Sequence, residues 1–282
     1  MLNSAVSLGR TGAEVFLLTE FADDDVGHLI CQFLKDNSVS TELISIYNGR
    51  KSPLALACLN TENDARFSFY EDFPISRSLN TISDLSSEDI VMFSSILAVS
   101  REIRPGLKSL LDEAKIKGAS IIYDPNIRPS HGMSSEDTEE LVQENIAYAD
   151  IVRASHEDMV NLKGVGNADD AYDYVRDSGC MCLIYTMGRD GVCLRTPELS
   201  KYYTIPEIET VSTVGAGDSF NSGIVCQFLC ENISPSKAQR MSESVWDRVI
   251  ERGMGFASYV CRINENYISG SFAANIKSLR KG

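Results

Sequence analysis

Residues 213–223 read Thr-Val-Gly-Ala-Gly-Asp-Ser-Phe-Asn-Ser-Gly. Gly215 and Gly217 are separated by one small residue, so successive backbone N–H groups can converge on an anion with no Cβ in the way. We expect this stretch to be an anion-binding loop that opens a helix. Asp218 then sets a negative charge beside the loop, and its natural task is to accept a proton from an attacking hydroxyl group. The alternative is a glycine-containing loop whose Asp merely favours a helix N-terminus, and a bare Gly-x-Gly-Asp motif does not exclude it.

Strand and helix patterns alternate on the N-terminal side of this loop. Short buried strands are predicted at about 90–93, 119–123, 151–153 and 181–185, and helices at about 104–117, 136–147 and 169–177. Such alternation implies right-handed crossovers, and therefore an α/β fold with a doubly wound, mostly parallel sheet flanked by helices. Strands between residues 184 and 205 are expected as an antiparallel addition at the edge. The chain after Gly217 has an almost entirely helical pattern, with Pro235 opening the helix that contains Trp246.

The N-terminal segment interrupts this rhythm with a hairpin. The pattern predicts a helix over Leu2–Arg10, a strand over Glu14–Thr19, and a helix from the acidic triplet Asp23–Asp25 to about Lys35. Two β-rich runs, 54–59 and 66–70, are joined by a turn-like polar segment. We therefore expect a single domain over residues 1–282, with a small β lid inserted at about residues 50–75.

Composition excludes several classes of protein. The 282 residues carry 26 Lys and Arg against 40 Asp and Glu, a net charge of −14, so a nucleic-acid backbone would be repelled. No apolar run approaches the roughly 20 residues needed to cross a bilayer, and no signal-peptide pattern follows Met1. The eight cysteines form no Cys-x-x-Cys pair, and the three histidines are scattered, which argues against a zinc site. These features predict a cytoplasmic protein without nucleic-acid or membrane partners.

Four motifs occur in an order that is specific to one family. They are Asp124-Pro-Asn126-Ile-Arg128, Asp150-Ile-Val-Arg-Ala-Ser155-x-Glu157-Asp158, Thr186-x-Gly188-x-x-Gly191 and the 213–223 stretch. Together they resemble the PfkB/ribokinase family of carbohydrate kinases over nearly the whole chain, and its fructokinase-like members in particular. The resemblance implies a ribokinase-like fold. It also implies an ATP-dependent kinase that transfers a phosphoryl group to a hydroxyl of a small sugar.

The resemblance assigns roles to the loop and to the turn before it. It implies that Asp218 is the catalytic base, and that the backbone of Gly215, Ala216 and Gly217 forms the anion hole for the transferring phosphoryl group. It implies that the turn after residue 185 contacts the phosphates and ribose of ATP. The expected nucleotide-binding residues are Thr186, Gly188, Gly191, Thr213 and Asn221.

The resemblance also implies a role for magnesium, which the family organises largely through water with an Asn-x-x-Glu element. Ser155 and Asp158 stand at the matching positions, and the expected magnesium-binding residues are Glu157 and Asp158. Both matching positions depart from the family pattern, although other fructokinase-like members carry Ser at the first. A helix N-cap at Ser155 explains the same residues and is compatible with the metal role. Ser212 stands where the family often has an Asp that helps form a monovalent-cation site, which argues against activation by potassium.

The acceptor sugar is expected to lie between strand ends and the lid. Asp124, Asn126 and Arg128 follow a predicted strand, and open α/β sheets bind ligands at the carboxyl ends of their strands. Phe67 and Phe69 stand in the lid, where they either cover the sugar or pack the hairpin. We expect fructose as the first acceptor, with 2-keto-3-deoxygluconate, ribose or a nucleoside as alternatives. Lids pair in many relatives, which suggests a homodimer through the lid.

The start of the chain departs most from the family. Family chains begin with a strand that carries a sugar-binding Asp, followed by lid strands and a Gly-Gly-x-x-x-Asn element. Met1–Gly9 resembles this element from just after its two glycines, so Asn3 matches the Asn that contacts a sugar hydroxyl. We expect a misassigned start codon or a shortened chain, and a gain in stability and sugar affinity when upstream residues are added. The competing hypothesis is a sugar- or nucleotide-binding relative without turnover. The intact 213–223 stretch favours the enzyme, and the missing N-terminal strands favour the binding protein.

Overall fold

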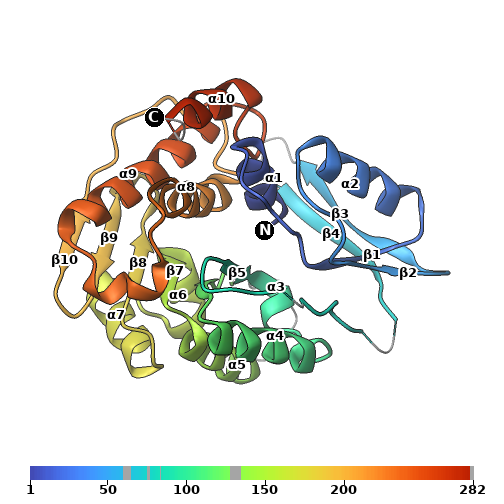
Figure 1. Cartoon of the computed structure of the whole chain (residues 1–282), viewed down its shortest axis with the longest axis horizontal. Helices are drawn as coiled ribbons and strands as arrows, with labels where there is room; N and C mark the ends of the chain where they lie inside the picture. The colour runs from blue at the N-terminus through green and yellow to red at the C-terminus, as the bar shows by residue number, and fades with distance from the viewer. Residues whose placement is uncertain (60–64, 75–76, 83, 128–134, 280–282) are drawn as a thin grey trace.

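The computed structural model describes residues 1–59, 65–74, 77–82, 84–127 and 135–279 (Figure 1). Its main sheet has six strands in the order β10-β9-β8-β7-β6-β5. Four of them are parallel: β5 (Ile90–Ser94), β6 (Ser120–Asp124), β7 (Ile151–Ser155) and β8 (Leu183–Thr186). Two antiparallel strands complete one edge: β9 (Val192–Arg195) and β10 (Ser200–Tyr203). The predicted α/β class and the antiparallel edge addition are confirmed.

Helices cover both faces of this sheet (Figure 1). One face carries α3 (Ser95–Ala98), α4 (Arg104–Lys117), α5 (Ser135–Tyr148), α6 (His156–Lys163) and α7 (Ala168–Asp177). The other carries α1 (Leu2–Arg10), α8 (Ala216–Glu231), α9 (Glu243–Val260) and α10 (Gly270–Leu279). Successive side chains of β6 point to opposite faces, so Tyr123 packs in the first core and Ile122 in the second. In the described part of the chain, no helix combines the length and apolar character needed to cross a membrane.

Helix α9 begins later than the sequence pattern predicts. Pro235 opens a separate 3-10 helix, η3 (Pro235–Arg240), so the prediction that it opens the helix containing Trp246 is wrong. Met241 and Ser242 have extended backbone between the two helices, which interrupts the helical hydrogen bonds. Trp246 is fully buried, and its ring meets that of Phe228 on α8 at 6.2 Å, nearly edge-on. Burial of these rings fastens α9 to α8.

The N-terminal part forms a separate parallel pair of strands, β1 (Thr19–Ala22) and β2 (Ile44–Tyr47). The prediction of a strand over Glu14–Thr19 is wrong, because β1 begins only at Thr19. Its partner β2 starts opposite that residue, and before it only Phe16 forms an isolated bridge, with Ser40. Within the described residues, β1 and β2 pair with no strand of the main sheet.

The segment predicted as a lid forms an antiparallel hairpin, as predicted, and one carboxylate fastens it to a helix. Its strands are β3 (Lys51–Leu59) and β4 (Ala65–Asp72), next to α2 (Asp25–Asp36). The carboxylate of Asp24 caps α2 by accepting from the N–H of Gly27 at 2.9 Å. It also accepts from the N–H and the hydroxyl of Ser52 on β3, at 3.0 and 2.6 Å. Asp24 of the acidic triplet therefore caps a helix, as the sequence predicts, and anchors the hairpin as well.

These hydrogen bonds predict how stability depends on pH. The hydroxyl of Ser52, followed by the N–H groups of Gly27 and Ser52, lowers the pKa of Asp24 from 3.8 to about 2. A carboxylate with a lowered pKa stabilises the fold above pH 3.8, and this contribution is lost as the pH falls toward about 2. Asp24→Asn keeps one cap acceptor but cannot titrate. Urea unfolding at a series of pH values should therefore show the stability difference between wild type and variant narrowing below pH 3.8. A difference that does not change with pH would contradict this account.

Candidate active site

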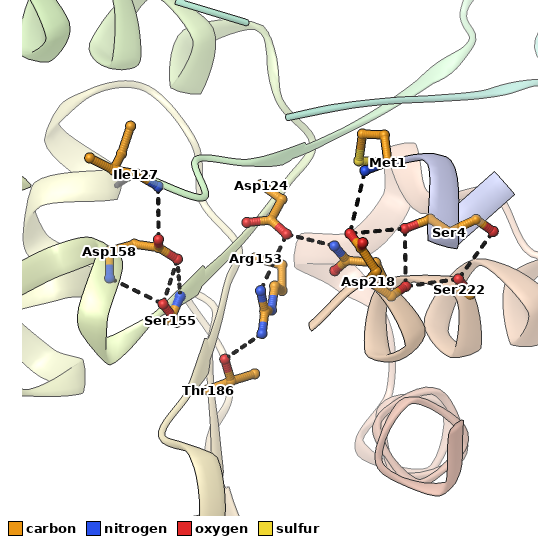
Figure 2. A network of polar contacts seen from close by, with 11 residues as sticks. Met1, Ser4, Asp124, Ile127, Arg153, Ser155, Asp158, Thr186, Asp218 and Ser222 are labelled. Atoms are coloured by element: carbon orange, nitrogen blue, oxygen red, sulfur yellow. Dashed lines mark hydrogen bonds and ion pairs between the residues drawn. The ribbon is translucent and has the colours of Figure 1, made fainter. Parts of the chain in front are cut away.

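Polar side chains gather where β6, β7 and β8 end, opposite the first turn of α8 (Figure 2). Asp124 ends β6, Ser155 ends β7 and Thr186 ends β8. The carboxyl ends of parallel strands meet at one edge of a sheet, so residues from distant parts of the chain come together there. This edge is the candidate active site.

Gly215 makes the turn that leads into α8. Its φ is +80°, in the left-handed region, and a Cβ on it would lie 2.2 Å from the carbonyl oxygen of Asn266, so only glycine fits. No side chain caps the helix, and its first turn lies at the positive end of the helix dipole, which favours an anion. Thr213, just before the turn, is exposed, and its carbonyl accepts from the N–H of Ala216 at 3.2 Å. The prediction of a loop that opens a helix is confirmed.

Substitution of Gly215 tests this turn. Gly215→Ala is expected to destabilise the protein by about 1–3 kcal/mol, because Ala is strained at this φ and its Cβ would displace Asn266. Gly255→Ala is the matched control: Gly255 lies in α9, nothing lies within 4 Å of its added Cβ, and Ala favours a helix by about 1 kcal/mol. Thermal unfolding should give a lower midpoint for the first variant and an equal or higher one for the second. A midpoint that is unchanged in Gly215→Ala would refute the steric argument.

Asp218 lies on the first turn of α8 and faces α1. Its side chain is 18% exposed. Its Oδ2 accepts from Nδ2 of Asn3 at 2.8 Å, while its Oδ1 lies 3.4 Å from the hydroxyl of Ser4 and 3.5 Å from the amino group of Met1. Two residues that the sequence marks separately, Asn3 and Asp218, are therefore in direct contact. The hydroxyl of Ser222 donates to the backbone carbonyl of Asp218 at 2.8 Å, which holds the turn in place.

Asp124 lies in a buried network that joins three strands to α8 (Figure 2). Its Oδ2 accepts from Nδ2 of Asn221 at 2.6 Å and from Nη1 of Arg153 at 3.2 Å. Nη2 of Arg153 donates to Oγ1 of Thr186 at 2.7 Å. Burial raises the pKa of the Asp124 carboxyl, and the Arg153 cation is the largest influence in the opposite direction. Asp124 is 2% exposed, so Asp218 is the carboxylate of the two that can meet a ligand hydroxyl.

The turn after β8 is shaped by two glycines around the 3-10 helix η2 (Gly188–Asp190). Gly191 has a φ of +108°, and a Cβ on it would lie 2.4 Å from the carbonyl oxygen of Tyr203. Gly188 has a φ of +57° and is exposed, with nothing within 4 Å of an added Cβ. The N–H of Met187 closes the turn by donating to the carbonyl of Gly191 at 2.9 Å. Thr186 thus joins the buried network, whereas in the turn beyond it Gly188 is exposed and Gly191 is buried.

Ser155 and Asp158 form a capping box at the start of α6, which confirms the helix-cap interpretation. Oδ2 of Asp158 accepts from the N–H and the hydroxyl of Ser155, at 2.8 and 2.6 Å. Its Oδ1 accepts from the N–H of Ile127 at 2.9 Å. Asn126, the preceding residue, has a φ of +44°, so the cap also fixes a backbone turn in the left-handed region.

Magnesium fits this corner through Glu157 better than through Asp158. Asp158 is buried, and both its oxygens are bound by donors of Ser155 and Ile127. Glu157 is exposed on the first turn of α6. Among the described residues, no three His, Cys, Asp or Glu side chains cluster as a metal site. Magnesium commonly keeps several waters and binds one or two carboxylates together with substrate phosphates, and one exposed carboxylate fits that mode.

Sequence reasoning missed two parts of this edge. Arg153 is buried in the middle of β7, and its signal is a basic residue between apolar neighbours in the strand. Ser94 and Ser95 follow the apolar run of β5. Ser95 has a φ of +64°, and the buried hydroxyl of Ser94 has no partner in the described part of the chain. Left-handed backbone at Ser95 and Asn126 is of the kind that clusters at ligand sites.

Some predicted residues lie outside what the structure describes. Arg128 is among them, and so are the side chains of Phe67 and Phe69. Their roles in sugar binding stay predictions.

Comparison with known proteins identifies the family from sequence and the same fold from structure. The family model for pfkB family carbohydrate kinases matches residues 1–246. The chain is 25% identical over 246 residues to probable fructokinase-4 of Arabidopsis thaliana, covering 86% of this chain and 76% of that one. It is 27% identical over 226 residues to aminoimidazole riboside kinase of Salmonella typhimurium, covering 79% of this chain and 70% of that one.

Solved structures share the fold. Aminoimidazole riboside kinase from Salmonella enterica, complexed with aminoimidazole riboside and an ATP analogue, gives a TM-score of 0.78 at 22% identity, with 99% of this chain and 90% of that chain covered. Fructokinase from Vibrio cholerae O395, bound to fructose, ADP and calcium ion, gives a TM-score of 0.83 at 16% identity, with 98% and 89% covered. Both confirm the ribokinase-like fold. The chain belongs to the pfkB family of carbohydrate kinases and is an ATP-dependent phosphotransferase.

Proposed function

We propose that this sugar kinase phosphorylates a hydroxyl of fructose, with Asp218 as the base. The observation that carries the proposal is the contact between Asn3 and the partly exposed carboxylate of Asp218, directly after the uncapped turn that opens α8. An anion site and a proton acceptor lie side by side there, as in-line phosphoryl transfer requires.

Asn3 leaves Asp218 in a suitable orientation for this task. The amide of Asn3 donates to Oδ2 at 2.8 Å and so orients the carboxylate. The two contacts of Oδ1, at 3.4 and 3.5 Å, are long, so this oxygen can accept a hydroxyl group of the sugar. When the oxygen of that hydroxyl attacks the γ-phosphorus of ATP, its proton passes to Asp218 and ADP leaves.

The backbone N–H groups of the loop stabilise the phosphoryl group as it transfers. We assign the anion hole to Gly215, Ala216 and Gly217, at the end of a helix that no side chain caps. Donors held in place by a helix need no reorganisation when charge develops, which is why such sites contribute strongly to catalysis. Thr186, Gly188, Gly191, Thr213 and Asn221 are proposed to position the nucleotide.

We propose that magnesium binds together with the phosphates of ATP. When bound, it would neutralise part of the phosphate charge. Glu157 would hold it through water, and Asp158 would keep the first turn of α6 in place through its bonds to Ser155 and Ile127.

The relatives suggest which sugar is the acceptor, and the ends of the strands suggest where it binds. Fructokinases among the relatives favour fructose, and the riboside kinase favours a nucleoside-like acceptor as the second candidate. Asn3, Asp124, Asn126 and Arg128 are proposed to surround the sugar, with Asp124 acting through its buried partners.

We propose a homodimer through the lid because apolar side chains are exposed on one face of the hairpin. Leu54, Leu56 and Tyr70 are exposed, and Leu54 pairs with Tyr70 across the hairpin, so their side chains share one face. Exposed apolar side chains on a hairpin face favour a second hairpin as cover.

A coupled assay of ADP formation tests the function. Wild-type protein with ATP and magnesium is expected to show the highest kcat/KM with fructose in a panel that includes ribose, 2-keto-3-deoxygluconate and a nucleoside. A higher kcat/KM with another sugar would contradict the proposal of fructose and identify that sugar as the acceptor. Binding of sugar and ATP without turnover on any acceptor would favour a binding protein over an enzyme.

A further inference from the structure

We infer that Arg153 is a positioning residue for ATP: it holds the hydroxyl of Thr186 as a donor toward the nucleotide phosphates and lies against the anion-hole turn at Gly217. The inference rests on the proposed function and extends it to a residue for which the motifs imply no role. Arg153 does not need to touch ATP itself.

A single guanidinium reaches three parts of the site, and Figure 2 shows its bonds to two of them, Asp124 and Thr186. Nη1 donates to Asp124 at the end of β6, and Nη2 donates to Thr186 at the end of β8. A Cβ added to Gly217 would lie 3.2 Å from Nη1 and 3.3 Å from Nη2, so the guanidinium is packed against the first turn of α8. Arg153 therefore connects the strand that leads into the nucleotide loop with the turn of the anion hole.

The hydrogen bond to Thr186 decides what that hydroxyl can do. A threonine hydroxyl has one proton to donate and two lone pairs that accept. Arg153 is only a donor, so it occupies a lone pair and leaves the proton for another partner. Within the described part of the chain, that proton has no acceptor. A charged donor also polarises the hydroxyl, which makes it a stronger donor to an anion such as a phosphate.

The network around Arg153 is incomplete as it stands. Nε of Arg153, Oδ1 of Asp124 and Oδ1 of Asn221 are buried, and none has a partner among the described residues. A purely structural ion pair gains little unless its remaining polar atoms are satisfied. Unsatisfied atoms in a buried network beside an anion loop fit a site that is completed by a ligand and its waters.

Binding of a non-hydrolysable ATP analogue with magnesium, measured by calorimetry without sugar, tests the inference. Arg153→Met and Thr186→Val are each expected to weaken binding by about tenfold to a hundredfold, the loss of one hydrogen bond to a charged group. The double variant is expected to lose no more than either single variant, because both changes act through the same Thr186 hydroxyl. Arg153→Lys keeps a charge and a donor and should recover part of the affinity.

Two further variants separate positioning from folding. Arg153→Met with Asp124→Asn removes both charges of the buried pair and keeps an acceptor for Asn221. It should fold even if Arg153→Met alone unfolds the protein, and it should show the loss of binding expected for Arg153→Met. Arg104→Met is the matched control, since the Arg104 side chain is 12% exposed against 9% for Arg153, and its partners Glu144 and Asn145 lie outside the site. It should bind the analogue like wild type.

Unchanged binding in Arg153→Met, or losses that multiply in the Arg153→Met/Thr186→Val double variant, would overturn the inference. The proposed function fails on a different result, which is a wild-type protein that binds the analogue but phosphorylates no sugar.

Discussion

Asp218→Asn is expected to reduce kcat by about 10²–10⁴ or more while nucleotide binding stays close to that of wild type. Asn has nearly the shape of Asp and still offers an oxygen to the amide of Asn3, so the contact between α1 and α8 can persist. It cannot take a proton from the attacking hydroxyl. Steady-state ADP formation gives the rate, and calorimetry with a non-hydrolysable ATP analogue gives the binding.

Asp170→Asn is the matched control for this variant. Asp170 also stands on the first turn of a helix, α7, and its Oδ2 also accepts from an Asn side chain, Asn167, at 2.8 Å. Loss of the Asp170 carboxylate in this variant should leave kcat unchanged. If Asp218→Asn keeps more than about a tenth of the wild-type rate, the carboxylate is not the base.

Gly217→Val is expected to fold and to lose at least about a hundredfold in kcat, which is the effect of removing one anion-hole donor. A Cβ at this position would lie 3.2 Å from Nη1 of Arg153, and the guanidinium cannot retreat easily because Asp124 and Thr186 hold it. The branched side chain would therefore push the turn and its N–H groups out of line.

Gly270→Val controls for the substitution itself. Gly270 is the first residue of α10, and nothing lies within 4 Å of an added Cβ. That variant should keep the wild-type rate. Wild-type kinetics in Gly217→Val would mean that the turn only begins a helix and takes no part in catalysis.

The sequence predicted correctly those elements whose first and last residues are marked by their own amino acids. Helix α4 has the predicted bounds because Pro105 stands in its first turn and Gly118, with a φ of +76°, ends it. The strand over Glu14–Thr19 was misplaced because a strand needs a partner, and the partner β2 begins opposite Thr19. Which residues of two distant segments pair cannot be predicted from the sequence of either segment alone.

The same distinction holds at the site. The position of Asp218 on the first turn of a helix could be predicted, because Gly215 and Gly217 in the adjacent sequence indicate the turn that precedes it. The contacts of Arg153 could not be predicted, because Asp124 and Thr186 lie on neighbouring strands and come together only in the folded sheet. The burial of Asp124 is likewise a tertiary property, since the sequence marks a strand end but not the Asn221 amide that covers its carboxylate.

The most direct test of the central claim is the fate of the γ-phosphoryl group of ATP. Wild-type protein incubated with fructose, magnesium and γ-labelled ATP should transfer the label to fructose, with a fructose phosphate as the labelled product, and Asp218→Asn at the same nucleotide occupancy should not. Label that appears only as inorganic phosphate, or equal transfer by the two proteins, would contradict the account.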